Sequence, residues 1–78
     1  MVIGRDSGQC DVTLLHSTVS RRHARLSVSR DNRLEIEDLG SMNGTWIDGV
    51  AVKAEVAAAL KPGATLRIGD IELVVRYD

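Results

Sequence analysis

The chain of 78 residues has no phenylalanine, one cysteine, one proline and only two aromatic residues, Trp46 and Tyr77. The single cysteine, Cys10, cannot form a disulfide within the chain, and no run of 18 apolar residues predicts a membrane-spanning helix. With so few aromatic side chains, any core must be built mainly from Val, Ile, Leu and Ala. We therefore expect a reduced, cytoplasmic protein in which Cys10 is a small buried hydrophobe.

The size and charge of the chain narrow the possible functions. Apolar residues make up 44% and charged residues 27% of the sequence, which is typical of one small domain over residues 1–78 and excludes a multi-domain enzyme. The formal net charge is −1, but residues 1–33 carry six Arg against three Asp, whereas residues 34–78 carry four basic against eight acidic groups. This balance argues against general nucleic-acid binding, and the basic half favours an anionic ligand.

Apolar residues mostly recur at every second position, which predicts strands. Three hairpins are expected, over 24–37, 45–52 and 65–75, and Asp48-Gly49 in the second suits a two-residue type I′ turn. Short strands with a turn every eight to twelve residues indicate an all-β sandwich rather than a parallel α/β fold. The alanine-rich segment 52–60 is the one candidate helix, and we interpret it as a loop or single turn between strands.

No catalytic, cofactor or metal pattern is complete. Ser20 and His23 are three residues apart but lie in no nucleophile elbow, so triad chemistry is not supported. The spacing of Cys10, His16 and His23 matches no common zinc pattern, and Gly4 to Gly8 lacks the ending of a phosphate-binding P-loop. We expect neither an enzyme nor a bound cofactor or metal.

Three polar clusters remain, each at the end of an apolar stretch: Gly4-Arg5, Ser20-Arg21-Arg22-His23 and Ser41-Met42-Asn43-Gly44. Taken singly, each has an ordinary interpretation, since an Arg at a strand end is usually solvated, a Ser often caps a turn, and Asn-Gly is a common turn. If the loops at one end of a sandwich converge, however, the clusters together offer the guanidinium, hydroxyl and amide donors that a phosphate needs.

These clusters, together with the stretch Asp38 to Thr45 and with Gly69, resemble the forkhead-associated (FHA) domain from one end of the chain to the other. The ordered motifs Gly-Arg, Ser-x-x-His and Asn-Gly carry the resemblance. It implies an FHA-like (SMAD/FHA) β-sandwich of mostly antiparallel strands. Such a domain would bind phosphothreonine-containing proteins or peptides through its inter-strand loops. These ligands would be products of Ser/Thr kinases in signalling.

The resemblance also implies residue roles. Arg5 would hold the phosphate, Ser20 would donate its hydroxyl to a phosphate oxygen, and Arg21 would be a second cationic partner. Asn43 would hydrogen-bond the peptide main chain. Ser41 would also be a phosphopeptide-binding residue. Three further residues would support the site: Gly4, His23 and Gly44.

Two departures from the family pattern leave alternatives open. Many FHA domains have Thr at the position of Met42, so a phospho-independent scaffold that keeps the fold is the second hypothesis. The family also has about two strands before the Gly-Arg motif, so we expect a truncated domain or fragment with an open sheet edge, which a second copy could cover as a homodimer. Contacts to nucleic acid or to a lipid membrane are disfavoured by the charge and the lack of interleaved aromatics.

Overall fold

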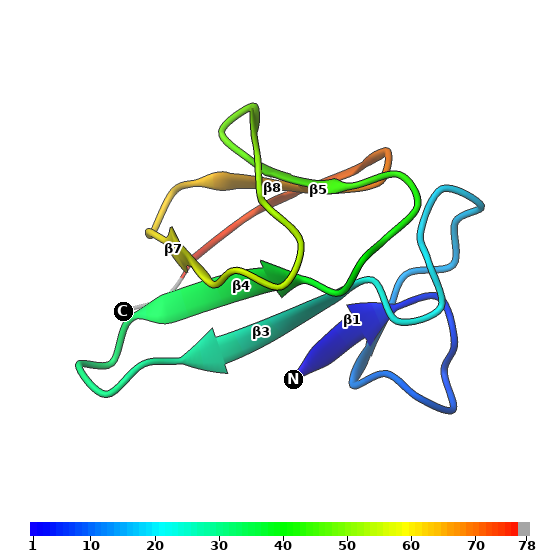
Figure 1. The fold of residues 1–78 in the computed structure, drawn as a ribbon, viewed down its shortest axis with the longest axis horizontal. Coiled ribbons are helices and arrows are strands. Elements are labelled where there is room, and N and C mark those ends of the chain that lie inside the picture. Colours follow the sequence, from blue (N-terminus) through cyan, green and yellow to red (C-terminus); the bar gives the residue numbers. More distant parts are fainter. Residues whose placement is uncertain (77–78) are drawn as a thin grey trace.

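Residues 1–76, the part of the chain that this computed structural model describes, form short strands connected by loops (Figure 1). The strands are β1 (Val2–Gly4), β2 (Val12–Thr13), β3 (Ala24–Val28), β4 (Leu34–Asp38), β5 (Thr45–Ile47), β6 (Val50–Ala51), β7 (Ala58–Leu60), β8 (Thr65–Ile68) and β9 (Ile71–Val74). No helix occurs in these residues, and hence none that could cross a membrane.

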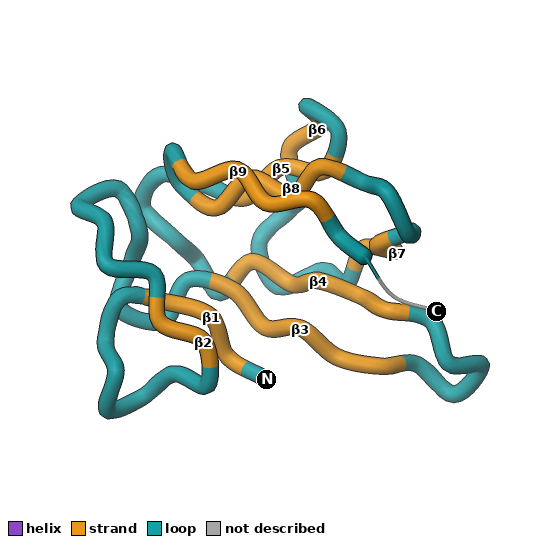
Figure 2. The backbone as a smooth tube through the Cα atoms, turned by 180° about the vertical axis from the view of Figure 1, so that it is seen from behind, coloured by secondary structure: helices purple, strands orange, loops and turns teal. Residues whose placement is uncertain are grey.

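The strands form two sheets packed face to face. One has the order β2-β1-β3-β4-β7 and the other β6-β5-β8-β9, and they make the lower and upper layers of Figure 2. Every strand pair is antiparallel except β1 with β2. The predicted mostly antiparallel β-sandwich is confirmed.

The three predicted hairpins are present, as β3–β4, β5–β6 and β8–β9. In the second, Asp48 and Gly49 have φ angles of 49° and 81°, the positive values that a type I′ turn requires at both central positions. Local sequence was sufficient here because the alternation of apolar residues and the turn residues indicate the same register.

The alanine-rich segment follows the prediction only in part. Residues 52–57 are a loop, as expected, but Ala58–Leu60 forms β7, which pairs with β4 from Leu34 opposite Leu60 to Ile36 opposite Ala58. The loop prediction was wrong for these three residues. Leu60 is 2% exposed, so burial and pairing with a neighbouring strand outweigh the helix preference of alanine.

The core lies between the sheets, and no Phe, Trp or Tyr side chain belongs to it among residues 1–76. Its buried apolar residues are aliphatic, as predicted: Ile3, Val19, Ala24, Ile36, Leu60, Ala64, Leu66 and Ile68. The expectation for Cys10 was wrong: the residue is only partly buried, and its thiol donates to the Arg21 carbonyl at 3.0 Å. Among residues 1–76, three polar residues are also buried, namely His23, Asp38 and Thr45.

Candidate functional site

Loops from three parts of the chain meet at one end of the sandwich. In Figure 1 the loop before β3, the loop between β4 and β5, and the β8–β9 turn lie together at the end opposite the β3–β4 turn. A hollow of about 200 Å³ opens there, lined by Arg5, Ser17, Val19, Ser20, Arg21, Met42 and Asn43. The tertiary structure therefore brings Arg5, Ser20, Arg21 and Asn43 together, but Ser41 does not line the hollow.

Arg5 follows β1 and is held by the loop before β3. Its backbone N–H donates to the Ser20 carbonyl at 2.9 Å, and its Nε–H donates to the Val19 carbonyl at 3.0 Å. Val19 is itself buried, at 1% exposure. The Nε bond orients the guanidinium and leaves its two terminal nitrogens available to an acceptor in the hollow.

Ser20 is fixed in a donor role. Its Oγ accepts a hydrogen bond of 3.1 Å from the Met42 backbone N–H, and its own backbone N–H donates to His23 Nδ1 at 3.0 Å. Among the described residues no acceptor takes the hydroxyl hydrogen, which is therefore free to donate to a ligand. The neighbouring Arg21 side chain is exposed at the wall of the hollow and contributes a second positive charge.

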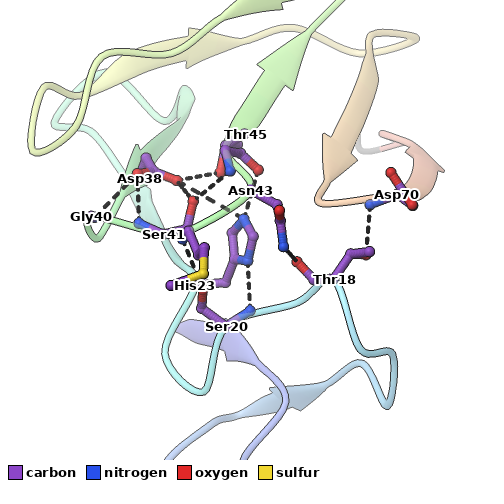
Figure 3. Close-up of polar contacts among 11 residues, drawn as sticks. Thr18, Ser20, His23, Asp38, Gly40, Ser41, Asn43, Thr45 and Asp70 are labelled. Carbon is purple, nitrogen blue, oxygen red and sulfur yellow. Dashed lines mark hydrogen bonds and ion pairs between the residues drawn. The ribbon is translucent and has the colours of Figure 1, made fainter.

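His23 joins two of the loops from within the core, with 0% exposure. Since Nδ1 accepts from the Ser20 N–H, the ring hydrogen lies on Nε2, which donates to the Gly44 carbonyl at 2.7 Å. The ring thus bridges the loop that carries Ser20 and the turn that carries Asn43 (Figure 3). Asp38 Oδ1 lies 4.0 Å from Nε2, too far for a hydrogen bond.

Asp38 organises the loop between β4 and β5. Its Oδ1 accepts from the Ser41 and Thr45 hydroxyls, at 2.5 and 2.7 Å, and its Oδ2 accepts from the backbone N–H groups of Gly40 and Ser41, at 3.1 and 3.0 Å. Burial raises the pKa of this carboxyl, but the hydrogen bonds from the Ser41 and Thr45 hydroxyls and from the Ser41 backbone N–H outweigh it, so the pKa lies below its usual value. The carboxylate is therefore a structural anion.

The Ser41 hydroxyl is hydrogen-bonded within this loop. Its hydroxyl donates to Asp38 and accepts a bond of 3.0 Å from the Gly44 backbone N–H. Both functions of the hydroxyl are therefore satisfied inside the loop.

Three residues around the hollow carried no predicted role. Asp38 could have been suspected, since an Asp at a strand end two residues before a Gly is typical of an Asx-turn. Thr18 and Asp70 carried no such signal: the Asp70 backbone N–H bonds Thr18 Oγ1 across 52 residues of sequence.

A second, smaller hollow of about 140 Å³ lies away from this site, lined by Trp46, Gly49, Thr65, Arg67 and Glu72. The Arg67 guanidinium stacks on the Trp46 ring at 3.9 Å. Among residues 1–76, no group of three or more His, Cys, Asp or Glu side chains is placed to hold a metal ion.

Comparison with known proteins decides the family. A family profile described as FHA domain matches residues 1–69. The chain belongs to the FHA family. This FHA domain is 40% identical over 78 residues to the FHA domain-containing protein FhaB of Mycolicibacterium smegmatis, covering 97% of this chain and 46% of that protein. It is 32% identical over 77 residues to the FHA domain-containing protein PS1 of Arabidopsis thaliana, covering 97% of this chain and 5% of PS1. The chain thus spans less than half the length of these curated relatives.

Solved structures give the same fold. An FHA structure from work on phosphothreonine-dependent FHA domain interactions has a TM-score of 0.87 and 30% identity, with 99% of this chain and 75% of that chain covered. The N-terminal FHA domain of Rad53p from S. cerevisiae, in complex with a phosphothreonine peptide, has a TM-score of 0.78 and 30% identity. The match covers 87% of this chain and 54% of that chain. FHA domains are interaction modules, and the sandwich described above is theirs.

Proposed function

We propose that this FHA domain binds phosphothreonine-containing segments of other proteins, substrates of Ser/Thr kinases, at the hollow between its loops. The observation that carries the proposal is that Arg5, Ser20, Arg21 and Asn43, from three separate stretches of sequence, line one hollow of about 200 Å³. The solved FHA neighbour bound to a phosphothreonine peptide supports it.

The chemistry of the hollow suits a phosphate dianion. A phosphothreonine carries about −1.5 to −2 charge at neutral pH and strong acceptor oxygens. Two guanidinium groups supply charge and paired N–H donors, and the free Ser20 hydroxyl hydrogen supplies a third donor group. We assign phosphate contact to Arg5, Ser20 and Arg21, and contact with the peptide main chain to Asn43.

Ser41 takes a different role in this proposal from the one the family resemblance implied. Because its hydroxyl is occupied by Asp38 and by the Gly44 N–H, we assign it to support of the loop, with His23 and Gly44. Gly4, buried beneath the Arg21 carbonyl, supports the loop that carries Ser20.

A phospho-independent scaffold is the second candidate function, and Met42 favours it. Its side chain lines the hollow, is 90% exposed and has no hydroxyl to donate to phosphate. A scaffold would bind a partner equally well with and without the phosphate.

A matched peptide pair separates the two functions. A degenerate phosphothreonine peptide library and its unphosphorylated counterpart are titrated into the domain by fluorescence anisotropy. We expect at least about tenfold tighter binding of the phosphorylated peptides, since hydrogen bonds to charged groups contribute about 1.5–3 kcal/mol each. Arg5→Ala or Ser20→Ala should remove most of the difference.

Exposed residues away from the site provide the controls. Arg30→Ala, in the β3–β4 turn, makes the same charge change as Arg5→Ala, and Ser27→Ala on β3 removes an exposed hydroxyl. Both should leave the discrimination unchanged. Equal affinity of the two peptide libraries for the unmodified domain would establish the scaffold instead.

A further inference from the structure

Thr18 connects the three loops of the site, although it belongs to no recognised motif of the sequence. It lies two residues before Ser20 and is partly buried. Figure 3 shows its side chain directed at the β8–β9 turn and its backbone facing Asn43. Each of its polar groups has a partner, and the partners come from different parts of the chain.

The partners define a direction for every hydrogen bond. His16 Nδ1 accepts from the Thr18 backbone N–H at 3.2 Å, so it carries no hydrogen, and the Thr18 hydroxyl must donate to it at 2.7 Å. The Thr18 Oγ1 in turn accepts from the Asp70 backbone N–H at 2.9 Å. The hydroxyl thus donates one hydrogen bond and accepts one, and it ties the loop before β3 to the β8–β9 turn.

The Thr18 carbonyl then orients Asn43. It accepts a bond of 2.9 Å from Asn43 Nδ2, which distinguishes the nitrogen of the amide from its oxygen. One N–H and the oxygen Oδ1 of Asn43 are left for a ligand. A donor and an acceptor side by side match the C=O and N–H groups that an extended peptide presents.

Ser20 is anchored separately. The Ser20 backbone N–H donates to His23 Nδ1, and the Ser20 Oγ accepts from the Met42 backbone N–H. The Ser20 carbonyl accepts from the Arg5 backbone N–H. None of these bonds passes through Thr18 or the β8–β9 turn. A change at the Thr18 hydroxyl should therefore disturb Asn43 more than the phosphate-facing residues.

The β8–β9 turn is shaped to receive Thr18. A Cβ on Gly69 would lie 2.5 Å from the Thr18 carbonyl oxygen and 2.8 Å from its Oγ1, and Gly69 has a φ of +58°. No larger side chain fits between them without moving Thr18. Gly69 also donates its backbone N–H to the Gly44 carbonyl, at 3.1 Å.

We propose that Thr18 is a positioning residue for peptide recognition: held by His16 and Asp70, it fixes the side-chain amide of Asn43 so that the domain reads the peptide main chain as well as the phosphate. This inference rests on the proposed function. It adds the β8–β9 turn to the elements that support peptide binding. It also separates contact with the phosphate from contact with the peptide main chain, because Ser20 and Asn43 are held in place by different hydrogen bonds.

The test compares two ligands on matched variants. Thr18→Val keeps the shape of the side chain and removes the hydroxyl, Thr18→Ser restores it, and Thr13→Val removes an exposed hydroxyl on β2 as a control. Each is titrated with a phosphothreonine peptide and with free phosphothreonine, by NMR. For Thr18→Val we expect about five- to tenfold weaker peptide binding and free phosphothreonine affinity within about twofold of the parent. Thr18→Ser and Thr13→Val should behave as the parent.

The outcomes are distinguishable. Equal losses for both ligands, or no loss for the peptide, would overturn the positioning role, as would failure of Thr18→Ser to restore binding. If the parent does not prefer phosphorylated peptide, the proposed function fails first. The role of Thr18 is then decided by the NMR signals of the Asn43 side-chain amide, which should shift in Thr18→Val and not in Thr18→Ser. If Thr18→Val does not fold, Gly69→Ala, which crowds the Thr18 carbonyl, should show the same difference between the ligands.

Discussion

At the scale of single residues, the site depends on polar atoms whose roles are fixed by their partners. Ser20 and Ser41 are the same residue type in neighbouring loops, yet one has a free hydroxyl hydrogen and the other has none. The difference arises because Met42 donates to Ser20, whereas Asp38 accepts from Ser41. The sequence placed both serines at the site, but it could not assign these directions, since Met42, the partner of the Ser20 hydroxyl, lies in another loop.

Asp38 gives a prediction at this scale. Its carboxylate accepts four hydrogen bonds, so Asp38→Asn should lower the free energy of unfolding at pH 7 by about 2 kcal/mol. Because the pKa of Asp38 is lowered in the folded state, its stabilisation is present above the ordinary Asp value of about 4 and is lost as the pH falls through the lowered value. Urea unfolding between pH 7 and 3 should show the gap between the parent and Asp38→Asn narrowing below about pH 4.

Asp31 provides the matched control for this experiment. A hydrogen bond from Ser29 lowers the pKa of its carboxyl too, but the group is exposed in the β3–β4 turn. Asp31→Asn should be close to the parent in stability at every pH, since exposed charges contribute little. A gap between the parent and Asp38→Asn that stays constant down to pH 3 would contradict the assigned role of Asp38.

At the scale of elements, the turn between β4 and β5 links the core to the site. Gly44 accepts the His23 Nε2 hydrogen bond and the Gly69 N–H at its carbonyl. It has a φ of +87°, and a Cβ there would lie 2.8 Å from Trp46 Cη2. Both the backbone angle and the contact with Trp46 therefore require glycine at this position.

Gly44→Ala should consequently lower both stability and peptide affinity. We expect a loss of about 1–3 kcal/mol in unfolding free energy, measured by thermal denaturation, together with weaker binding of the phosphothreonine peptide because Asn43 is displaced. Gly63→Ala is the control: it has a similar φ of +84° and open space around it. Gly63→Ala should lose stability through the backbone angle alone. Unchanged peptide binding in Gly44→Ala would be evidence against the coupling of the β4–β5 turn to the site.

At the scale of the whole molecule, β9 forms an open edge. Among the described strands it pairs only with β8. Val75 donates its N–H to the Ala64 carbonyl, and bonded pairs alternate along an antiparallel ladder, so the backbone groups of Glu72 and Val74 point away from β8. We propose that another strand covers this edge, from a longer polypeptide or from a second copy.

Residues 1–78 alone have only the second copy available, so we expect a dimer in light scattering. If two β9 strands pair around Leu73, Glu72 faces Val74 of the second copy rather than another Glu72, which avoids a like-charge pair. Val74→Lys should yield a monomer that still discriminates phosphorylated peptide, since edge lysines oppose pairing. The control Val28→Lys lies on β3, inside its sheet. A monomeric parent with one cooperative melt would contradict both versions of the proposal.

The sequence by itself determined the class of fold, the hairpins and the order of the site motifs, because alternation and turn chemistry act between residues close together in the chain. It also determined that the core would be aliphatic. The tertiary structure decided that Ala58–Leu60 would be a strand and which polar atoms face the hollow. The bonds that set these directions join Ser20 to Met42 and Thr18 to Asp70, across 22 and 52 residues. Such contacts exist only when the two sheets pack, so no local pattern encodes them.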